Sequence, residues 1–138
     1  MPGWFKPVAL ILAAVPIIVL GSHGNYLGLI FDSAFIPLLY IPLILSIISI
    51  IGNTINSIDV FNGVASGFII ITMIPLLVSV ILFGNTNVFL MGLPLLFGSI
   101  AIYHYHKFPS KIFLGDSGTL LLGSMYAGIL IAGNSEII

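Results

Sequence analysis

Two short polar stretches interrupt an otherwise apolar sequence and carry the side chains best suited to chemistry. The first contains Asn53, Asn56, Asp59, Asn62 and Gly63. Asn53 and Asn56 have the spacing of residues that share one helix face. Amide and carboxylate oxygens are ligands that Mg²⁺ accepts in proteins. A simpler interpretation stays open from this stretch alone, namely that these residues end one helix and cap the next.

The second polar stretch places one carboxylate, Asp116, between Gly115 and Gly118, with Lys111 shortly before it. Glycines allow a backbone to approach a ligand closely, although Asp116 could instead be only a helix N-cap. Mg²⁺ is commonly bound by one or two protein groups plus substrate phosphates, so Asn56 and Asp116 would suffice as ligands. A metal ion bridging a diphosphate, with lysines nearby, predicts phosphoryl transfer, for which a nucleotide sugar is a natural donor.

The composition of the chain places it in a lipid bilayer. Only 5% of the 138 residues are charged, 59% are hydrophobic, and the mean hydropathy is +1.29. No water-soluble domain of this size has such a balance. Since the chain has no cysteine, any metal must be held by oxygen or imidazole ligands. The net charge of -1 is too small to favour nucleic acid as a partner.

The apolar runs predict an all-α fold, a polytopic membrane bundle of about five transmembrane helices. These runs cover residues 4–20, 36–56, 63–83, 88–103 and 119–131. A short alternating segment at residues 26–31 predicts one small hairpin on the external face. We expect residues 1–138 to form a single membrane domain.

The lysines predict the orientation of this domain. Five spans would put Lys6, Lys107 and Lys111, the only cations of the chain, on one side of the membrane. By the positive-inside rule that side is cytoplasmic. The two polar stretches would lie on the same side. We therefore expect a multi-pass protein of the cell membrane, with its N-terminus and candidate site facing the cytoplasm.

The polar motifs resemble those of the polyprenyl-phosphate N-acetylhexosamine-1-phosphate transferases, which include the dolichyl-phosphate GlcNAc-1-phosphate transferase and the bacterial MurNAc-pentapeptide enzyme. The similarity rests on Asn53-x-x-Asn56-x-x-x-x-x-Asn62-Gly63 at a helix junction and on Phe108-Pro-Ser-Lys-Ile-Phe113-x-Gly115-Asp116 two spans later. It implies transfer of a sugar 1-phosphate from a UDP-N-acetylhexosamine to a membrane polyprenyl or dolichyl phosphate, with release of UMP. This would be the first step of lipid-linked glycan synthesis, with Mg²⁺, or Mn²⁺ in its place, as cofactor.

The resemblance also implies roles for individual residues. Asn56 and Asp116 look like the metal ligands and catalytic residues, and Lys6 looks like a cation that faces phosphate. Phe113 looks like the ring that stacks on uracil, and Asn62 like an amide that recognises it. Two alternatives stay open, because Phe113 could be an ordinary interfacial aromatic and Lys6 a flanking anchor of the first helix.

Asp59, Gly63 and Lys111 complete the substrate-binding set that the resemblance implies. Asp59 is similar to the bacterial branch, whose motif reads Asp-Gly, but Val60 replaces that glycine. Asn62 is similar to the dolichol-type and archaeal branch. This mixed pattern favours GlcNAc or a related N-acetylhexosamine over MurNAc-pentapeptide as the sugar.

The resemblance covers only the middle portion of the family's chains, which have about ten spans. An acidic pair on an earlier cytoplasmic loop and a late loop rich in His or Arg have no counterpart in this sequence. We therefore expect a fragment of a longer transferase, or one product of a split gene, which needs the missing segments or a second chain and is inactive alone. His104 and His106 receive no role.

Two other classes of membrane protein compete with this interpretation. CDP-alcohol phosphotransferases need several aspartates along one helix and its neighbour, and the three in this chain, Asp32, Asp59 and Asp116, lie far apart. A non-enzymatic transporter or channel subunit is the remaining alternative, since polar residues within spans also mark transport paths. Such a path needs polar groups at mid-membrane, whereas these cluster at the ends of spans.

Overall fold

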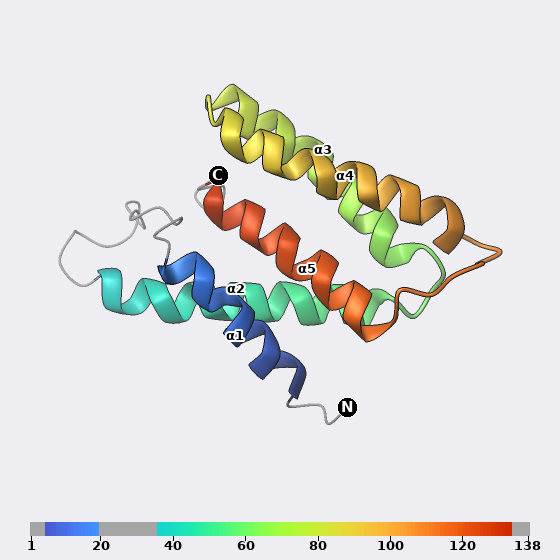
Figure 1. The fold of residues 1–138 in the computed structure, drawn as a ribbon, viewed down its shortest axis with the longest axis horizontal. Coiled ribbons are helices and arrows are strands. Elements are labelled where there is room, and N and C mark those ends of the chain that lie inside the picture. The colour runs from blue at the N-terminus through green and yellow to red at the C-terminus, as the bar shows by residue number, and fades with distance from the viewer. Residues whose placement is uncertain (1–4, 20–35, 134–138) are drawn as a thin grey trace.

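The computed structural model in Figure 1 describes residues 5–19 and 36–133. The regular secondary structure in these ranges is entirely helical. The helices are α1 (Phe5–Val19), α2 (Ile36–Ile58), α3 (Val64–Leu82), α4 (Thr86–His106) and α5 (Gly115–Ala132). The prediction of an all-α fold with five helices is therefore confirmed. The predicted hairpin at residues 26–31 lies outside the described residues.

Three of the five helices are long and apolar enough to cross a membrane. The qualifying segments are Ile41–Ile58 in α2, Val64–Leu82 in α3 and Thr86–His106 in α4. In the described part of the chain, α1 has 15 residues and α5 has 18. Helices α1 to α4 each continue through an internal proline, which membrane helices tolerate because their neighbours re-satisfy the freed carbonyl groups. The protein is a polytopic membrane helix bundle.

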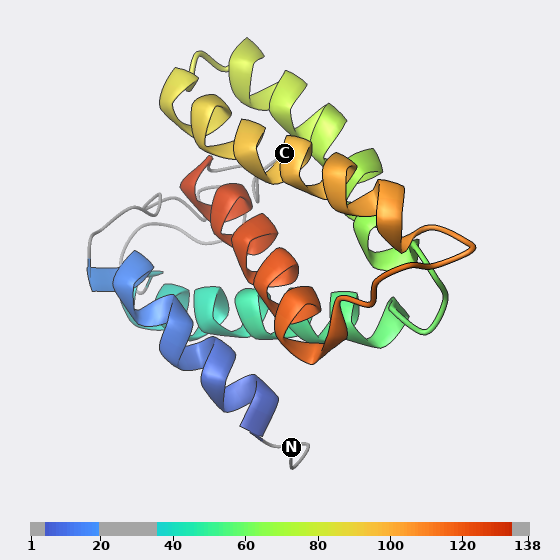
Figure 2. The same cartoon turned by 45° about the vertical axis from the view of Figure 1, so that its right-hand side comes forward.

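Helix α5 lies at the centre of the arrangement (Figures 1 and 2). Helices α3 and α4 run side by side as a hairpin, and α5 packs between this pair and α2. Helix α1 packs mainly on α2 and also touches the central helix. Since α5 contacts all four other helices, its first turn is a place where side chains from several elements can meet.

The most extensive helix contact joins α2 and α5 along an antiparallel seam. Its apolar end consists of buried residues spaced four apart on each helix, Ile44 and Ile48 of α2 and Ala127 and Ile131 of α5. Further along, a Cβ atom added to Gly123 would lie 2.7 Å from the Cα atom of Gly52. The two backbones therefore approach as closely as small residues allow. One turn beyond these glycines the seam becomes polar.

A second core lies between α3 and α4 and extends to α2 and α5. Its buried members include Ile69, Met73, Leu77, Val88 and Leu95. Met73 and Leu77 fill the space beside Gly92, where an added Cβ atom would collide with Leu77 Cδ2. This packing fixes the helical hairpin formed by α3 and α4.

The two polar loops lie side by side at one end of the bundle (Figures 1 and 2). Residues 59–63 connect α2 to α3, and residues 107–114 connect α4 to α5. The two loops touch at Gly63, where an added Cβ atom would lie 3.0 Å from Lys107 Cα. The φ of 85° at this residue also favours glycine. The fold thus brings together two motifs that are far apart in sequence.

Candidate functional site

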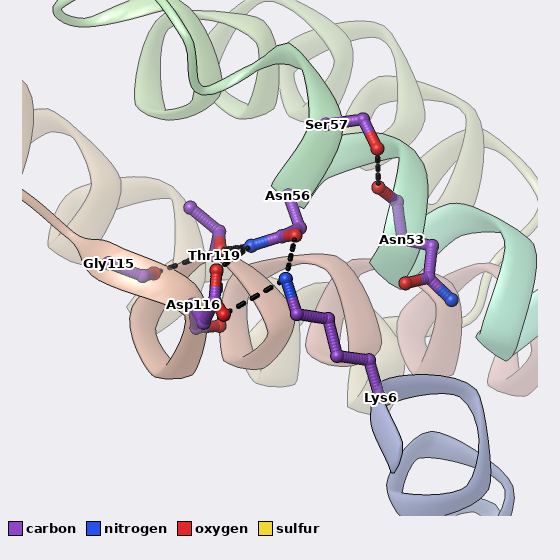
Figure 3. Close-up of polar contacts among 7 residues, drawn as sticks. All are labelled: Lys6, Asn53, Asn56, Ser57, Gly115, Asp116 and Thr119. Atoms are coloured by element: carbon purple, nitrogen blue, oxygen red, sulfur yellow. Dashed lines mark hydrogen bonds and ion pairs between the residues drawn. The ribbon is translucent and has the colours of Figure 1, made fainter. Parts of the chain in front are cut away.

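Three helices contribute to a polar cluster at this end of the bundle (Figure 3). Lys6 of α1 donates from Nζ to Asn56 Oδ1 at 3.0 Å, and Lys6 Nζ also lies 2.9 Å from Asp116 Oδ2. Asn56 of α2 donates from Nδ2 to Asp116 Oδ1 at 2.9 Å. It also donates to the hydroxyl oxygen of Thr119 at 2.8 Å. Lys6, Asn56 and Asp116, which the resemblance placed in one site, are in direct contact.

The seam between α2 and α5 positions this cluster. Asn56 lies one turn after Gly52 on α2, and Thr119 lies one turn before Gly123 on α5. The close approach of the two glycines therefore brings these side chains within hydrogen-bond distance. Thr119 is buried, and its hydroxyl donates to the carbonyl oxygen of Gly115 at 2.9 Å. The side chain of Asn56 is therefore held by two residues at the start of α5, Asp116 and Thr119.

The electrostatics of the cluster favour an ionised carboxylate. The hydrogen bond from Asn56 and then that from Lys6 lower the pKa of Asp116 below its ordinary value of 3.8. Asp116 also lies in the first turn of α5, where the helix dipole stabilises a negative charge. The carboxylate remains half exposed, with 50% of its side chain accessible. Asp116 is therefore negatively charged and accessible at neutral pH.

The same geometry tests whether Mg²⁺ fits. The Lys6 ammonium lies between one amide oxygen and one carboxylate oxygen, which shows that Asn56 and Asp116 converge on a cation. Among the described residues, no group of three or more His, Cys, Asp or Glu side chains could hold a metal. One carboxylate and one amide oxygen suit Mg²⁺, because this ion usually keeps waters and takes further ligands from substrate phosphates.

Asn53 does not join this cluster, although its spacing suggested a face shared with Asn56. Its Nδ2 atom donates to the carbonyl oxygen of Ser49 at 3.1 Å, within its own helix. Its own carbonyl oxygen accepts from the hydroxyl of Ser57 at 2.8 Å. Figure 3 shows Asn53 apart from the Lys6 ammonium.

Asp59 lies in a second, buried polar group beside the loops. Its Oδ1 atom is 3.4 Å from Nε2 of His106, and its side chain is only 10% exposed. The other ring nitrogen of His106, Nδ1, is 3.1 Å from the hydroxyl oxygen of Ser66. Burial raises the pKa of Asp59, while the nearby His106 and the backbone amide of Ala65 act in the opposite direction.

The remaining predicted residues lie on the two loops or beside them. Gly63 is buried against Lys107, whereas Asn62 and Phe113 are exposed. Phe113 leaves 76% of its surface accessible. Lys111 is also exposed, and its backbone amide donates to the carbonyl oxygen of Tyr105 at 2.8 Å. Asn62, Phe113 and Lys111 are thus accessible to a ligand at the end of the bundle that carries Asp116.

Sequence reasoning missed two residues of these polar groups, Thr119 and His106. Thr119 lies three positions after Asp116, so the helical spacing could have placed both on one face of α5. His106 lies in the last turn of α4 immediately before the second polar loop. No spacing rule connects it with Asp59 or Ser66, because their contact depends on how α3 and α4 pack.

Comparisons with known proteins agree with the motifs. The sequence pattern of the family described as "Glycosyl transferase family 4" matches residues 1–134. Three similar proteins each carry the name phospho-N-acetylmuramoyl-pentapeptide-transferase. The one from Streptococcus suis (strain 05ZYH33) is 32% identical over 86% of this chain and 36% of its own length. The one from Clostridioides difficile (strain 630) is 29% identical over 75% of this chain and 32% of its own length.

The third, from Desulforamulus reducens, is 26% identical over 94% of this chain and 40% of its own length. The chain thus spans about a third of the length of the curated relatives that it matches. No solved structure matches it significantly. Because the family pattern covers nearly the whole chain, and the residues that converge at the end of the bundle belong to the matched segment, this protein belongs to glycosyl transferase family 4.

Proposed function

We propose that this chain carries the metal and nucleotide site of an enzyme that transfers N-acetylhexosamine 1-phosphate from a UDP-sugar to a membrane polyprenyl phosphate. The observation that carries the proposal is the convergence of Lys6, Asn56 and Asp116 from three helices on one point. The names of the relatives support a sugar-phosphate transfer to which such a cation site is suited.

The reaction needs positioning and charge neutralisation more than proton transfer. An oxygen of the lipid phosphate attacks the sugar-bearing phosphorus of the donor, and the bond from that phosphorus to UMP breaks. A phosphate monoester has a second pKa of about 6, so the attacking oxygen is largely ionised at neutral pH. No strong general base is therefore required of this chain.

Asn56 and Asp116 would hold Mg²⁺, with Mn²⁺ as a substitute. When bound, the ion neutralises charge on the donor diphosphate. Thr119 would keep Asn56 oriented through the hydrogen bond at 2.8 Å. Lys6 would face the phosphates, since its ammonium already lies against both ligand side chains.

The exposed loop residues would bind the rest of the donor. We assign uracil stacking to Phe113, whose ring is accessible, and uracil recognition to Asn62 on the neighbouring loop. Gly63 lets the two loops approach each other, and Lys111 adds a positive charge near the phosphates. Asp59 belongs to the same loop as Asn62, although its Oδ1 atom is buried beside His106.

The site would face the cytoplasm of a multi-pass membrane protein, where UDP-sugars are available. Residues 1–138 would act as one membrane domain together with further segments of the transferase, either in the same polypeptide or in a second chain. We retain GlcNAc as the proposed sugar because of Val60 and Asn62. The names of the relatives favour MurNAc-pentapeptide, so a comparison of the two donors decides this point.

The proposal is tested by expressing the chain together with its flanking coding sequence and measuring transfer of labelled sugar phosphate to polyprenyl phosphate in membranes. We expect activity that EDTA abolishes and Mg²⁺ restores. Asn56→Ala and Asp116→Ala should each remove it while membrane insertion is retained. Ser124→Ala is the control, since among the described residues its hydroxyl bonds only to its own helix, at the Leu121 carbonyl.

Activity that survives both EDTA and Asp116→Ala would refute a metal-dependent transferase. Solute flux through proteoliposomes that persists in EDTA would support the transporter alternative instead. A donor screen in which only the pentapeptide substrate turned over would refute GlcNAc as the sugar and leave the transferase proposal intact.

A further inference from the structure

His106 is a buried polar residue that the reaction outlined above does not use. It lies in the last turn of α4, and its side chain is only 1% exposed. Its Nδ1 atom is 3.1 Å from the hydroxyl oxygen of Ser66 in α3, and its Nε2 atom is 3.4 Å from Oδ1 of Asp59 in the loop after α2. Both ring nitrogens therefore face a polar group on a different element.

These contacts determine which ring nitrogen of His106 faces which neighbour. A carboxylate oxygen can only accept, so the tautomer with hydrogen on Nε2 is the neutral form that suits Asp59, and its Nδ1 atom is then an acceptor beside the hydroxyl of Ser66. Oδ1 of Asp59 is buried and makes no hydrogen bond of standard geometry within the described residues. The backbone amide of Ala65 stabilises the carboxylate through a hydrogen bond, and the imidazole beside Oδ1 further reduces the cost of burying this charge.

The location of this contact connects the two polar loops. Asp59 begins the loop that carries Asn62, and His106 immediately precedes the loop that carries Phe113. The loops also meet at Gly63, where an added Cβ atom would lie 3.0 Å from Lys107 Cα. The buried contact between Asp59 and His106 thus influences where the loop of Asn62 lies relative to the loop of Phe113.

We propose that His106 is a positioning residue for the donor nucleotide, which acts by holding Asp59 and its loop in register with the loop of Phe113. This inference rests on the proposed function, because the ligand is the uridine nucleotide of that reaction. The imidazole itself is buried and does not touch the nucleotide. Its loss should therefore weaken binding of the nucleotide more than it affects the chemical step or binding of the lipid.

The test compares His106→Phe with His106→Gln in the chain expressed with its flanking coding sequence. The phenylalanine keeps a ring but offers no hydrogen bond, whereas glutamine can donate to Asp59. We expect His106→Phe to raise KM for the UDP-sugar about tenfold, with kcat and the KM for polyprenyl phosphate within about twofold of wild type. His106→Gln should restore most of the lost affinity.

Two further variants separate positioning from general damage. His104→Phe makes the same change two residues earlier at an exposed position and should leave all constants unchanged. Ser66→Ala removes the other partner of the imidazole with little change in volume, and should raise the donor KM about threefold. Titration of UMP by calorimetry should show the same order of affinities without turnover.

The carboxylate of Asp59 provides a direct readout. Asp59 is the charged group that faces the imidazole within the described residues, while Lys107 and His104 are exposed. Because the imidazole opposes the effect of burial, His106→Phe should raise the pKa of Asp59 further. Carboxyl NMR in lipid nanodiscs measures this change in wild type, His106→Phe and His106→Gln.

Each possible outcome decides the inference. An unchanged donor KM and UMP affinity in His106→Phe, with an active wild type, would overturn the role of His106 alone. An equal loss of kcat and of both KM values, not rescued by His106→Gln, would overturn it in favour of a purely structural role. A wild type that neither turns over nor binds UMP would overturn the proposed function together with this inference.

Discussion

Asn56 occupies the central position in the polar cluster, because it contacts residues of two other helices at once. Its amide oxygen accepts from Lys6, and its amide nitrogen donates to Asp116 and Thr119. An amide can do this because it presents a donor and an acceptor from one planar group. An aspartate at this position would lose both donated hydrogen bonds and add a second negative charge beside Asp116.

Lys6 should control the acidity of Asp116. The pKa of Asp116 is lowered by hydrogen bonds from Asn56 and Lys6. Lys6→Met should therefore raise that pKa toward 3.8, as measured by carboxyl NMR in nanodiscs. Because the pKa is lowered on folding, the stabilising contribution is present above 3.8 and is lost as the pH falls through the lowered value. An unchanged pKa in Lys6→Met would show that the ion pair does not persist in the membrane.

Thr119 should matter for metal binding although it is buried behind the two proposed ligands, Asn56 and Asp116. Thr119→Val keeps the shape of the side chain but removes the hydroxyl that accepts from Asn56. Groups that orient metal ligands typically contribute about 10–100-fold in affinity, so Mn²⁺ binding measured by EPR should weaken within that range. Thr72→Val is the matched control, because within the part of the chain that the structure describes its hydroxyl bonds only to carbonyls of its own helix, those of Phe68 and Ile69.

Among the secondary-structure elements, α2 and α5 determine whether the cluster can form. Their seam grades from buried isoleucine and alanine, through paired glycines, to the Asn56–Thr119 hydrogen bond. The apolar end supplies packing, and the glycines set the distance between the two helix axes. The distance between α2 and α5 at the polar end is therefore set by glycines and apolar residues, which have no chemical role of their own.

Gly123→Ala tests this dependence. The added methyl group would lie 2.7 Å from Gly52 Cα, which is backbone and cannot move without shifting α2. We expect lower thermal stability in detergent and weaker Mn²⁺ binding. Gly98→Ala in α4 should be neutral or stabilising by up to about 1 kcal/mol, because alanine is the better helix former and nothing described lies within 4 Å of the added atom. Equal effects of the two substitutions would refute the role given to the glycine pair.

The helices themselves could be predicted well from the sequence, because each apolar run is bounded by polar or glycine-containing loops. The ends were less accurate, since α4 continues to His106 and α5 begins at Gly115 rather than at residue 119. The contact of Asn56 with Asp116 followed from the family motifs. The partners of His106 and Thr119 did not, because helices that are apolar on all sides give no sequence signal for the face that each turns toward its neighbour.

On the scale of the whole molecule, the orientation in the membrane is open to a direct test. The chain has no cysteine, so single cysteines can be introduced without removing native ones. We expect cysteines at Ser57 and Ser110 to react with an impermeant maleimide only from the cytoplasmic side, and one at Asn87 only from the opposite side. Reaction of Ser57 and Ser110 variants from different sides would contradict a common face for the two loops.

The bundle as a whole places every predicted site residue at one end. Lys6 lies in the first turn of α1, Asn56 lies near the end of α2, and Asp116 lies in the first turn of α5. This arrangement suits the proposed reaction, because a water-soluble donor and a lipid-borne acceptor would meet only at the membrane surface. The rest of each helix then serves to hold this end in the bilayer.

The pairing of Gly52 with Gly123 also has a consequence for inheritance. Where two side chains of ordinary size meet, an enlargement of one can be compensated by a reduction of the other, so that lineages drift through many combinations. This exchange is closed to Gly123, because a Cβ atom added there would meet the backbone of Gly52 and Ile51, and Gly52 has no side chain that could become smaller. Descendants of this gene that keep the cluster should therefore retain Gly123, even where most of the apolar sequence around it has been replaced, whereas a larger residue at position 52 could be accommodated by a smaller one at position 10.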